Sequence, residues 1–417
     1  MRKLILFILL LGVVCLRLNA QFVYENRVYS PIVKTVTAHK TGDELSESVI
    51  YLNKGDKLLL EFDELSEETH RYEYTLIHCN SDWTQSTLSY DQYLEGFEIQ
   101  PIENYENSFN TIQRYVHYSQ MIPSKDMHLI KSGNYIIKVF TEGNPDNVIL
   151  TKRMYVVDDR SSVELDIKPS TVASLLRTHQ EVNVRIAGKN GAFFSNPEQF
   201  MNVKVKQNGN DYNIHQLKFR GMSGDKLDYS FEETNQFPAT NEFRFFDFTS
   251  LRRRSQYVAA FDFLDNQNQV YLREERLRNR LPYSYDKDLN GQFYIRNEYD
   301  DNSATTSDYA WIHFIYPAPQ TLEGTYYVVG AMNDFRANAQ SQMQYENGKY
   351  HLAMYLKQGY YNYQIVFKYG GDKTYSTFQT EGNFSETNNK YSVFVYYRNF
   401  SDDYDEIVGY STVEYNR

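Results

Sequence analysis

Apolar and polar residues alternate with a period of two in several stretches of this chain. In residues 181–188, valine and isoleucine alternate with polar or charged residues. Tyrosine, isoleucine and phenylalanine do the same in 359–371, and a third run of this kind spans 132–140. Successive side chains of a strand point to opposite faces, so this period predicts strands with one face in a core.

Turn-forming residues separate these runs. Asn208-Gly209 and Asn347-Gly348 each lie between two apolar segments, and both fit the positive φ angles of a type I′ hairpin turn. No long helical periodicity is present, and one short helix is expected at 89–94. Many short strands with regular turns indicate an all-β protein of tandem immunoglobulin-like β-sandwich domains.

The first twenty residues have the pattern of a secretory signal peptide. Arg2 and Lys3 precede an apolar run over 4–16, and Ala20 offers a small residue at the cleavage point. The run is too short for a membrane span, and no later stretch is apolar enough to cross a bilayer. We therefore expect export, cleavage after residue 20 and no direct membrane insertion.

Charge and cysteine content narrow the function classes. Cleavage removes three cations and no acid, which takes the formal charge from −11 to −14. Nucleic acid is not expected as a partner, because its phosphates repel such a chain. Cys15 leaves with the leader, so Cys79 cannot form an internal disulfide. The 38 tyrosines and 26 phenylalanines instead predict sandwiches held by aromatic packing.

About 400 mature residues exceed one sandwich of about 100, and we expect three. Acidic residues at 158–159 and a prolyl junction suggest one boundary, and four arginines between 273 and 280 precede a second. The predicted domains are an N-terminal sandwich over 21–158, a middle sandwich over 159–281 and a C-terminal sandwich over 282–417.

The segment 71–157 is the most distinctive part of the chain. It contains RYEYTLIHCNSDW, an aromatic and acidic loop STLSYDQYLEGFEIQPIENYENSFNT, and the strands SGNYIIKVF and ILTKRMYVVD. This string resembles the N-terminal domain of the type IX secretion system plug proteins of the Bacteroidota. The resemblance implies a periplasmic protein, held at the outer membrane through the translocon barrel, that closes the barrel pore when no substrate is engaged. It implies that barrel protein as partner, no cofactor and no small-molecule substrate.

The last domain has a second resemblance. Gly330, Asn333, Gly359, Tyr361 and Tyr363 match the pattern of early-set sandwich modules that accompany glycogen-active enzymes. The alternative function is therefore a periplasmic glycan-binding protein. Its candidate aromatic platform consists of Phe335, Tyr350, Tyr361 and Tyr363.

Two groups of residues are candidates for partner binding, because aromatic residues and arginine are enriched at interface hot spots. The first group is Asn80, Asp82, Trp83, Tyr93 and Phe97. The second group is Arg252, Arg253 and Arg254. Alternatively, the arginines protect an exposed sheet edge, because charged side chains prevent unwanted pairing with another strand.

Catalytic signatures are weak. His78 and Cys79 are adjacent, so in a regular strand they point to opposite faces, and a buried structural thiol is expected. The nine histidines lack the spacing of metal ligands, and the acidic runs 300–301 and 401–406 do not follow the ligand order of a calcium loop. No phosphate-binding loop or nucleophile elbow is present. We expect no enzyme activity, no metal and no cofactor.

Overall fold

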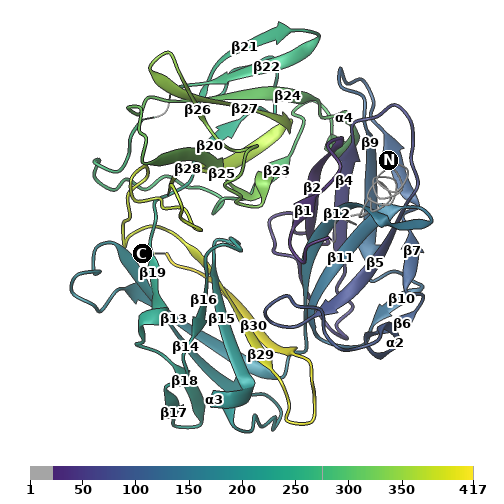
Figure 1. Cartoon of the computed structure of the whole chain (residues 1–417), viewed down its shortest axis with the longest axis vertical. Coiled ribbons are helices and arrows are strands. Elements are labelled where there is room, and N and C mark those ends of the chain that lie inside the picture. Colours follow the sequence, from purple (N-terminus) through teal and green to yellow (C-terminus); the bar gives the residue numbers. More distant parts are fainter. Residues whose placement is uncertain (1–21, 275, 417) are drawn as a thin grey trace, which may run out of the picture.

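The computed structural model describes residues 22–274 and 276–416, and the predicted signal peptide lies outside this part of the chain. Strands account for almost all of its regular structure, which confirms the all-β prediction. Three β-sandwiches pack against one another around a common centre (Figure 1). The first lies at the right of Figure 1, the second at the lower left and the third at the top.

The first sandwich is formed by the described residues up to Val157. One of its sheets contains β1 (Arg27–Val28), β3 (Val49–Tyr51), β5 (Tyr72–Cys79), β7 (Ile99–Pro101), β11 (Gly133–Thr141) and β12 (Asn144–Val157). The facing sheet contains β2 (Val33–Lys40), β4 (Leu58–Glu64), β9 (Val116–Ile122) and β8 (Asn104–Asn107). A short connection adds α2 (Tyr90–Tyr93), β6 (Leu94–Gly96) and β10 (Met127–Leu129). The predicted short helix at 89–94 is thus confirmed as α2, with Ser89 at its N-cap.

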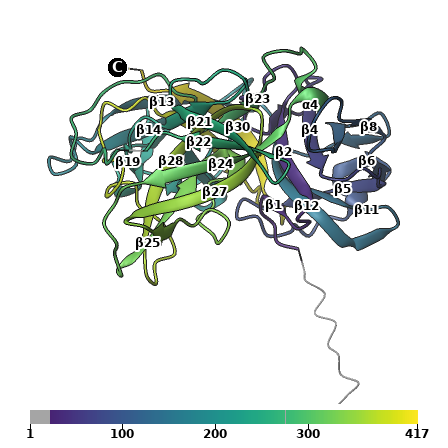
Figure 2. The ribbon, with the colours of Figure 1, turned by 90° about the horizontal axis from the view of Figure 1, so that it is seen from above.

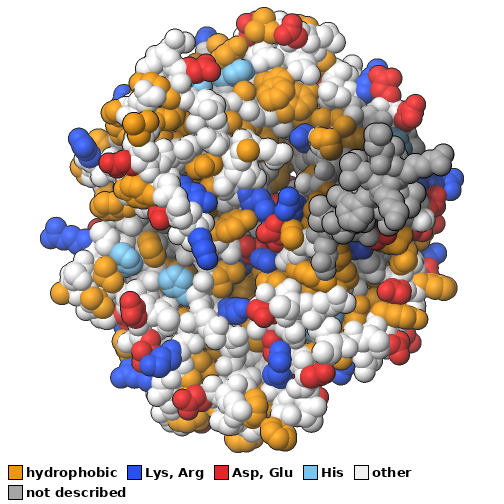
Figure 3. Space-filling model, in the orientation of Figure 1, with side chains coloured by type: hydrophobic (Ala, Val, Ile, Leu, Met, Phe, Trp, Pro, Cys, Tyr) orange, Lys and Arg blue, Asp and Glu red, His pale blue; other side chains and the backbone are white. Residues whose placement is uncertain are grey.

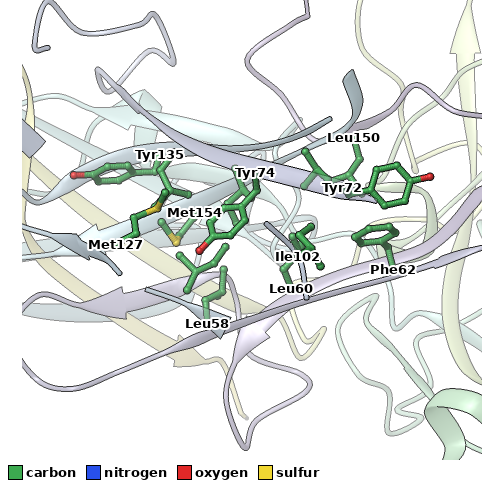
Figure 4. Packing of buried hydrophobic residues seen from close by; sticks show 14 of the residues in the cluster. Leu58, Leu60, Phe62, Tyr72, Tyr74, Ile102, Met127, Tyr135, Leu150 and Met154 are labelled. Carbon is green, nitrogen blue, oxygen red and sulfur yellow. The ribbon is translucent and has the colours of Figure 1, made fainter. Parts of the chain in front are cut away.

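Alternating side chains build the core of this sandwich. Leu58, Leu60 and Phe62 of β4 face Tyr72 and Tyr74 of β5 across the interior, as Figure 4 shows. All five are buried. Each aromatic ring removes on the order of 150–250 Å² from water, so packing can stabilise this sandwich without a disulfide.

The second sandwich combines two distant parts of the chain. One sheet contains β13 (Ser161–Pro169), β14 (His179–Gly188), β17 (Gly221–Ser223), β18 (Lys226–Tyr229) and β19 (Gln236–Pro238). The other contains β15 (Met201–Gln207), β16 (Ile214–Leu217), β29 (Lys390–Tyr397) and β30 (Glu406–Glu414). The helical turns α3 (Pro197–Phe200) and η1 (Glu233–Asn235) connect its strands.

The third sandwich lies between these two parts in sequence. One layer contains β20 (Arg244–Asp247), β23 (Phe293–Ile295), β25 (Gly324–Val329) and β28 (Gly359–Tyr369). The other contains β21 (Val258–Leu264), β22 (Gln267–Leu272), β24 (Tyr309–Tyr316), β26 (Gln344–Glu346) and β27 (Lys349–Lys357). Two short helical turns, α4 (Ser303–Thr306) and η2 (Ala331–Asn333), complete it.

Strand pairing crosses the predicted boundary at residue 281. The strands β20, β21 and β22 pair within the third sandwich, whereas β29 pairs with β15 of the second. We therefore propose that the third sandwich, roughly 241–384, is inserted into the second. The strand β12 ends at Val157, next to the predicted boundary at residue 158. Local turn and charge signals cannot reveal an insertion, because the two halves of the second sandwich are far apart in sequence.

One sheet continues from the first sandwich into the second. The strands β12 and β30 pair in parallel at Val157 and Ile407. The resulting ten-stranded sheet has the main order β16-β15-β29-β30-β12-β11-β5-β7. In Figure 1, the yellow strands β29 and β30 lie between the second sandwich and the first.

The predicted hairpin turns are present. Asn208 and Gly209 have φ angles of 53° and 68°, and Asn347 and Gly348 have 51° and 86°. Both residues of each pair are therefore in the left-handed region that a type I′ turn needs.

Candidate functional site

The loop after β5 joins the first sandwich to the second. Trp83 is buried, and its ring meets Tyr155 edge-on with 5.3 Å between centroids. Tyr155 in turn stacks on Phe394 of β29 at 4.2 Å, and the Arg153 guanidinium lies 4.2 Å from the Trp83 ring centre. We call the contact around Trp83, Tyr155 and Phe394 the lower joint. Trp83 is a candidate for partner binding in the sequence, and the structure instead buries it between the first and second sandwiches.

Polar contacts surround the lower joint. The Ser81 amide donates to a carboxylate oxygen of Asp405 at 2.8 Å, and Lys204 donates to the Ser81 carbonyl. Arg398 pairs with the same Asp405 at 2.8 Å and reaches Asn80 at 3.3 Å. Asp405 comes from the acidic run at 401–406, and in the structure it binds protein groups of the lower joint.

His78 and Cys79 lie on opposite faces of β5, as expected. His78 contacts the Ser86 hydroxyl at 2.9 Å and the Ser132 carbonyl at 3.1 Å, and burial lowers its pKa to about 4. Cys79 packs among the apolar residues of the lower joint, where burial raises the pKa of its thiol to about 12. A neutral, buried thiol is a poor nucleophile. The prediction of a structural cysteine is confirmed.

A second contact, the upper joint, holds the first sandwich against the third. Asp63 of β4 forms an ion pair with Lys357 of β27, and both side chains are 1% exposed. The Tyr309 hydroxyl donates to the same carboxylate at 2.7 Å, and the Lys357 ammonium lies 4.1 Å from the Tyr115 ring centre. A buried ion pair with hydrogen bonds on both partners resists separation, because breaking it leaves a buried charge alone.

The carboxylate of Asp63 continues into a chain of ionisable groups. His117 donates to Asp63 at 2.7 Å and lies 3.3 Å from Glu61, which also contacts His39 at 3.3 Å. Burial alone would lower the pKa of His117, but its hydrogen bonds to Asp63 and Glu61 outweigh burial and raise the pKa to about 9. Burial alone would raise the pKa of Glu61, but hydrogen bonds from the two histidines hold it at about 2. At neutral pH the upper joint therefore contains charged, paired groups.

A third ion pair cluster lies within the inserted sandwich, near its end. Glu381 is fully buried and accepts from Arg244 at 2.9 Å and from Arg278 at 2.7 Å. Arg278 belongs to the arginine group that marked a domain boundary in the sequence. In the structure Arg278 instead pairs with Glu381 inside the third sandwich.

A polar hollow of about 110 Å³ lies where the three sandwiches meet. Figure 3 shows Lys, Arg, Asp and Glu side chains gathered around it. The ion pairs at its rim are Lys206 with Glu47 at 2.6 Å, Arg153 with Asp211 at 3.1 Å and Lys152 with Asp334 at 2.7 Å. Each pair joins two different sandwiches, so ion pairs hold the three sandwiches together around the hollow.

The predicted partner-binding residues do not form one surface. Asn80 and Trp83 form contacts of the lower joint. Tyr93 is buried, and its hydroxyl donates a hydrogen bond to the Leu76 carbonyl at 3.2 Å. Asp82 is exposed and accepts from the Thr84 amide at 2.9 Å, which caps the turn. Phe97 is 67% exposed at the outer edge of the first sandwich.

The arginine cluster lies elsewhere, on a turn of the third sandwich. All three arginines are exposed. Arg252 lies 5.0 Å from the Tyr299 ring centre, Arg253 pairs with Glu298 at 2.6 Å, and Arg254 donates to the Ala259 carbonyl at 2.9 Å. Only Asp82, Phe97 and these arginines remain as exposed candidates for partner contacts, and they lie on separate parts of the molecule.

The candidate glycan platform is wrong as a binding surface. Phe335, Tyr350, Tyr361 and Tyr363 are at most 4% exposed. Tyr361 stacks on Phe246 at 5.2 Å inside the third sandwich. The resemblance implied a platform, but the structure places these four rings in the interior, where no sugar can reach them.

The part of the chain that the structure describes shows no group of three or more histidine, cysteine, aspartate or glutamate residues arranged to hold a metal ion. Within residues 22–274 and 276–416, every helix is too short or too polar to span a bilayer.

Comparison with known proteins identifies relatives. Residues 33–158 match the family model described as type 9 secretion system plug protein, first domain. A crystal structure of a hypothetical protein from Parabacteroides merdae ATCC 43184 is 31% identical, with a TM-score of 0.91 over 95% of this chain and 100% of the other. No curated protein matches the chain. The matched region contains every strand of the first sandwich except β1. It also contains the residues that the first sandwich contributes to the lower and upper joints.

Proposed function

This chain belongs to the type IX secretion system plug protein family and acts in type IX secretion, and from that premise we propose that it closes the translocon barrel from the periplasmic side when no substrate is engaged. Closure keeps small solutes from passing through an idle pore. The protein is then a periplasmic stopper that reaches the outer membrane through the barrel, with binding and release as its only activities.

The packing of three sandwiches into one block is the observation that supports occlusion best. A single sandwich of about 130 residues has a radius of gyration near 14 Å, whereas a compact chain of about 395 residues reaches about 21 Å. The corresponding widths are roughly 35 Å and 55 Å. A stopper this wide can cover a large lumen, and Figure 2 shows the first and third sandwiches side by side across its breadth.

Rigidity is the second requirement, because a flexible string of domains would let solutes pass between them. The continuous sheet through β12 and β30 and the buried pair of Asp63 with Lys357 oppose bending between sandwiches. Close-packed interiors have low compressibility and transmit strain, so we expect the three sandwiches to move as a unit.

Permeability and binding together test the proposal. Deleting the gene should sensitise cells to large antibiotics that the outer membrane excludes, and only in cells that also contain the translocon barrel. Purified mature protein should bind the purified barrel in detergent, and an engaged substrate should reduce that binding. Equal antibiotic sensitivity with and without the gene, in cells that contain the barrel, would refute closure.

A further inference from the structure

The first sandwich has an open sheet edge at β8. This strand is the last in its sheet, with β9 on one side and no strand on the other among the described residues. All four residues, Asn104–Asn107, are exposed, and none is a proline or a lysine. Natural proteins usually protect such an edge with lysine, proline or a covering segment.

The register shows which backbone groups of β8 are free to pair. The Ser108 amide donates to the Tyr115 carbonyl at 2.8 Å, and Tyr105 lies opposite Tyr118 in the same register. Hydrogen-bonded and non-hydrogen-bonded pairs alternate along an antiparallel ladder. The N–H and C=O groups of Tyr105 and Asn107 therefore point away from β9, toward the open side.

The neighbouring edge strand is less suited to pairing. β7 has only three residues and ends in Pro101, which has no N–H to donate. Exposed apolar side chains nevertheless flank both edges: Phe97 is 67%, Ile99 41% and Tyr105 49% exposed. These side chains and the open β8 backbone lie on one border of the sandwich, because Ile102 and Glu103 alone connect β7 to β8.

The negative charge of this border indicates which kind of partner it binds. Residues 72–113 contain no lysine or arginine. Four glutamates on this border are exposed and form no ion pair within the described residues, namely Glu95, Glu98, Glu103 and Glu106. Two cationic groups near this border already have acidic partners: Lys125 pairs with Asp126, and His117, opposite Glu106 in the β8–β9 pairing, binds Asp63 and Glu61.

We propose that β8 receives an extended, basic segment of the translocon barrel protein, which adds as a strand to this edge. Main-chain hydrogen bonds to Tyr105 and Asn107 hold the segment, its lysine or arginine side chains meet the glutamates, and its apolar side chains contact Phe97, Ile99 and Tyr105. This inference rests on the proposed function, since it names the surface by which the stopper docks.

Two sets of variants separate strand pairing from charge. Asn107→Pro removes an outward N–H but leaves the β8–β9 ladder intact, and Asn107→Ala is its control. Glu98→Lys with Glu103→Lys reverses charge on the border. Asp225→Lys with Asp372→Lys makes the same charge change at exposed positions on the other two sandwiches.

Binding of the full mature protein to the purified barrel in detergent is measured by biolayer interferometry at low and high salt. We expect about tenfold weaker binding for Asn107→Pro and for the glutamate pair, and wild-type binding for both controls. High salt should weaken the wild type more than the glutamate variant. Thermal melting confirms that each variant is folded.

The outcomes are distinct. If the wild type does not bind the barrel, the proposed function fails, and this inference fails with it. If the wild type binds and both test variants bind as their controls do, the docking surface is wrong while the stopper function stands. Concentration-dependent dimerisation that Asn107→Pro abolishes, with unchanged barrel binding, would assign the edge to a second copy and overturn the proposal.

Discussion

Single side chains decide how the sandwiches are held together. Asp63 and Lys357 lie almost 300 positions apart in sequence, and each neutralises the charge of the other inside the upper joint. Neither belongs to a recognisable motif. From the sequence alone, a lysine and an aspartate at strand positions are expected to face solvent. The contact between the first and third sandwiches buries them.

The ionisable chain at the upper joint predicts a pH dependence of stability. The pKa of His117 is about 9 in the folded protein and near 6.5 in an unfolded chain. A raised pKa stabilises the fold fully below pH 6.5, and this contribution disappears as the pH rises through 9. The free energy of unfolding should thus fall between pH 6.5 and 9, by on the order of 3 kcal/mol at most.

Urea unfolding at pH 6 and pH 9 tests this for the wild type and for His117→Gln. The variant should lose less stability over the same interval. Glu61 has the opposite sign: its pKa of about 2 stabilises the fold above pH 4.5, and this contribution is lost as the pH falls toward 2. An equal loss in wild type and variant between pH 6 and 9 would contradict the role of His117.

Cys79 provides a second prediction at this scale. Its thiol is fully buried and has a pKa of about 12, so it should not react with a thiol reagent at pH 8 in the native protein. Reaction should begin only when urea opens the lower joint. The measurement is the rate of colour release from a disulfide reagent across a urea series, and rapid reaction without urea would show that the joint is open in solution.

At the scale of elements, strands beside a joint are buried on both faces. On β11, Tyr135, Ile137 and Val139 face the core of the first sandwich, as the alternation predicts. Ile136 on the opposite face is also buried, since it belongs to the lower joint. The run of apolar residues at the end of β12 has the same cause: a strand with two covered faces needs no polar side.

The Trp83 loop yields a prediction for the lower joint. Trp83→Ala should lower the free energy of unfolding by about 3–5 kcal/mol, because it leaves a cavity beside Tyr155 and removes the contact with Arg153. Trp83→Phe keeps an aromatic ring and should lower the free energy of unfolding by less. Denaturant unfolding measures both, and a loss below about 1 kcal/mol for alanine would show that the loop contributes little to the joint.

The second tryptophan makes the joint observable. Trp311→Phe leaves Trp83 as the sole indole in the chain. Its emission should then be that of a buried ring in the folded protein and should shift to longer wavelength when the first and second sandwiches separate.

At the scale of the whole molecule, the insertion of the third sandwich predicts unequal effects of truncation. Removing residues 388–417 deletes β29 and β30, which supply Val393, Val395 and Val408 to the second core. The second sandwich should then fail to fold, and limited proteolysis should cut within 159–240. Persistence of that sandwich in the truncated chain would contradict the proposed insertion.

Excision of the inserted sandwich should be tolerated by comparison. The two ends of the insertion meet, since Asn389 donates to the Ala239 carbonyl at 2.8 Å and Thr387 donates to the Thr240 carbonyl at 3.1 Å. A short flexible linker in place of 241–384 should leave the first two sandwiches folded, as judged by circular dichroism and protease resistance.

Much of the fold follows from the sequence alone. Period-two alternation, Asn-Gly turns and the absence of helical periodicity determine an all-β chain, and the family resemblance over 71–157 agrees with the family match over 33–158. These properties are local: each depends on residues within one strand or one turn. The buried thiol of Cys79 also belongs here, because strand geometry alone separates it from His78.

The tertiary structure decided how the sandwiches join and which aromatic rings reach solvent. Tyr361 and Tyr363 alternate as a binding platform would, and only the facing sheet shows that they lie in a core. The pairs of Val157 with Ile407 and of Asp63 with Lys357 unite distant parts of the chain. Pairing and burial over such separations depend on which surfaces meet in three dimensions, and no local pattern of residues encodes that choice.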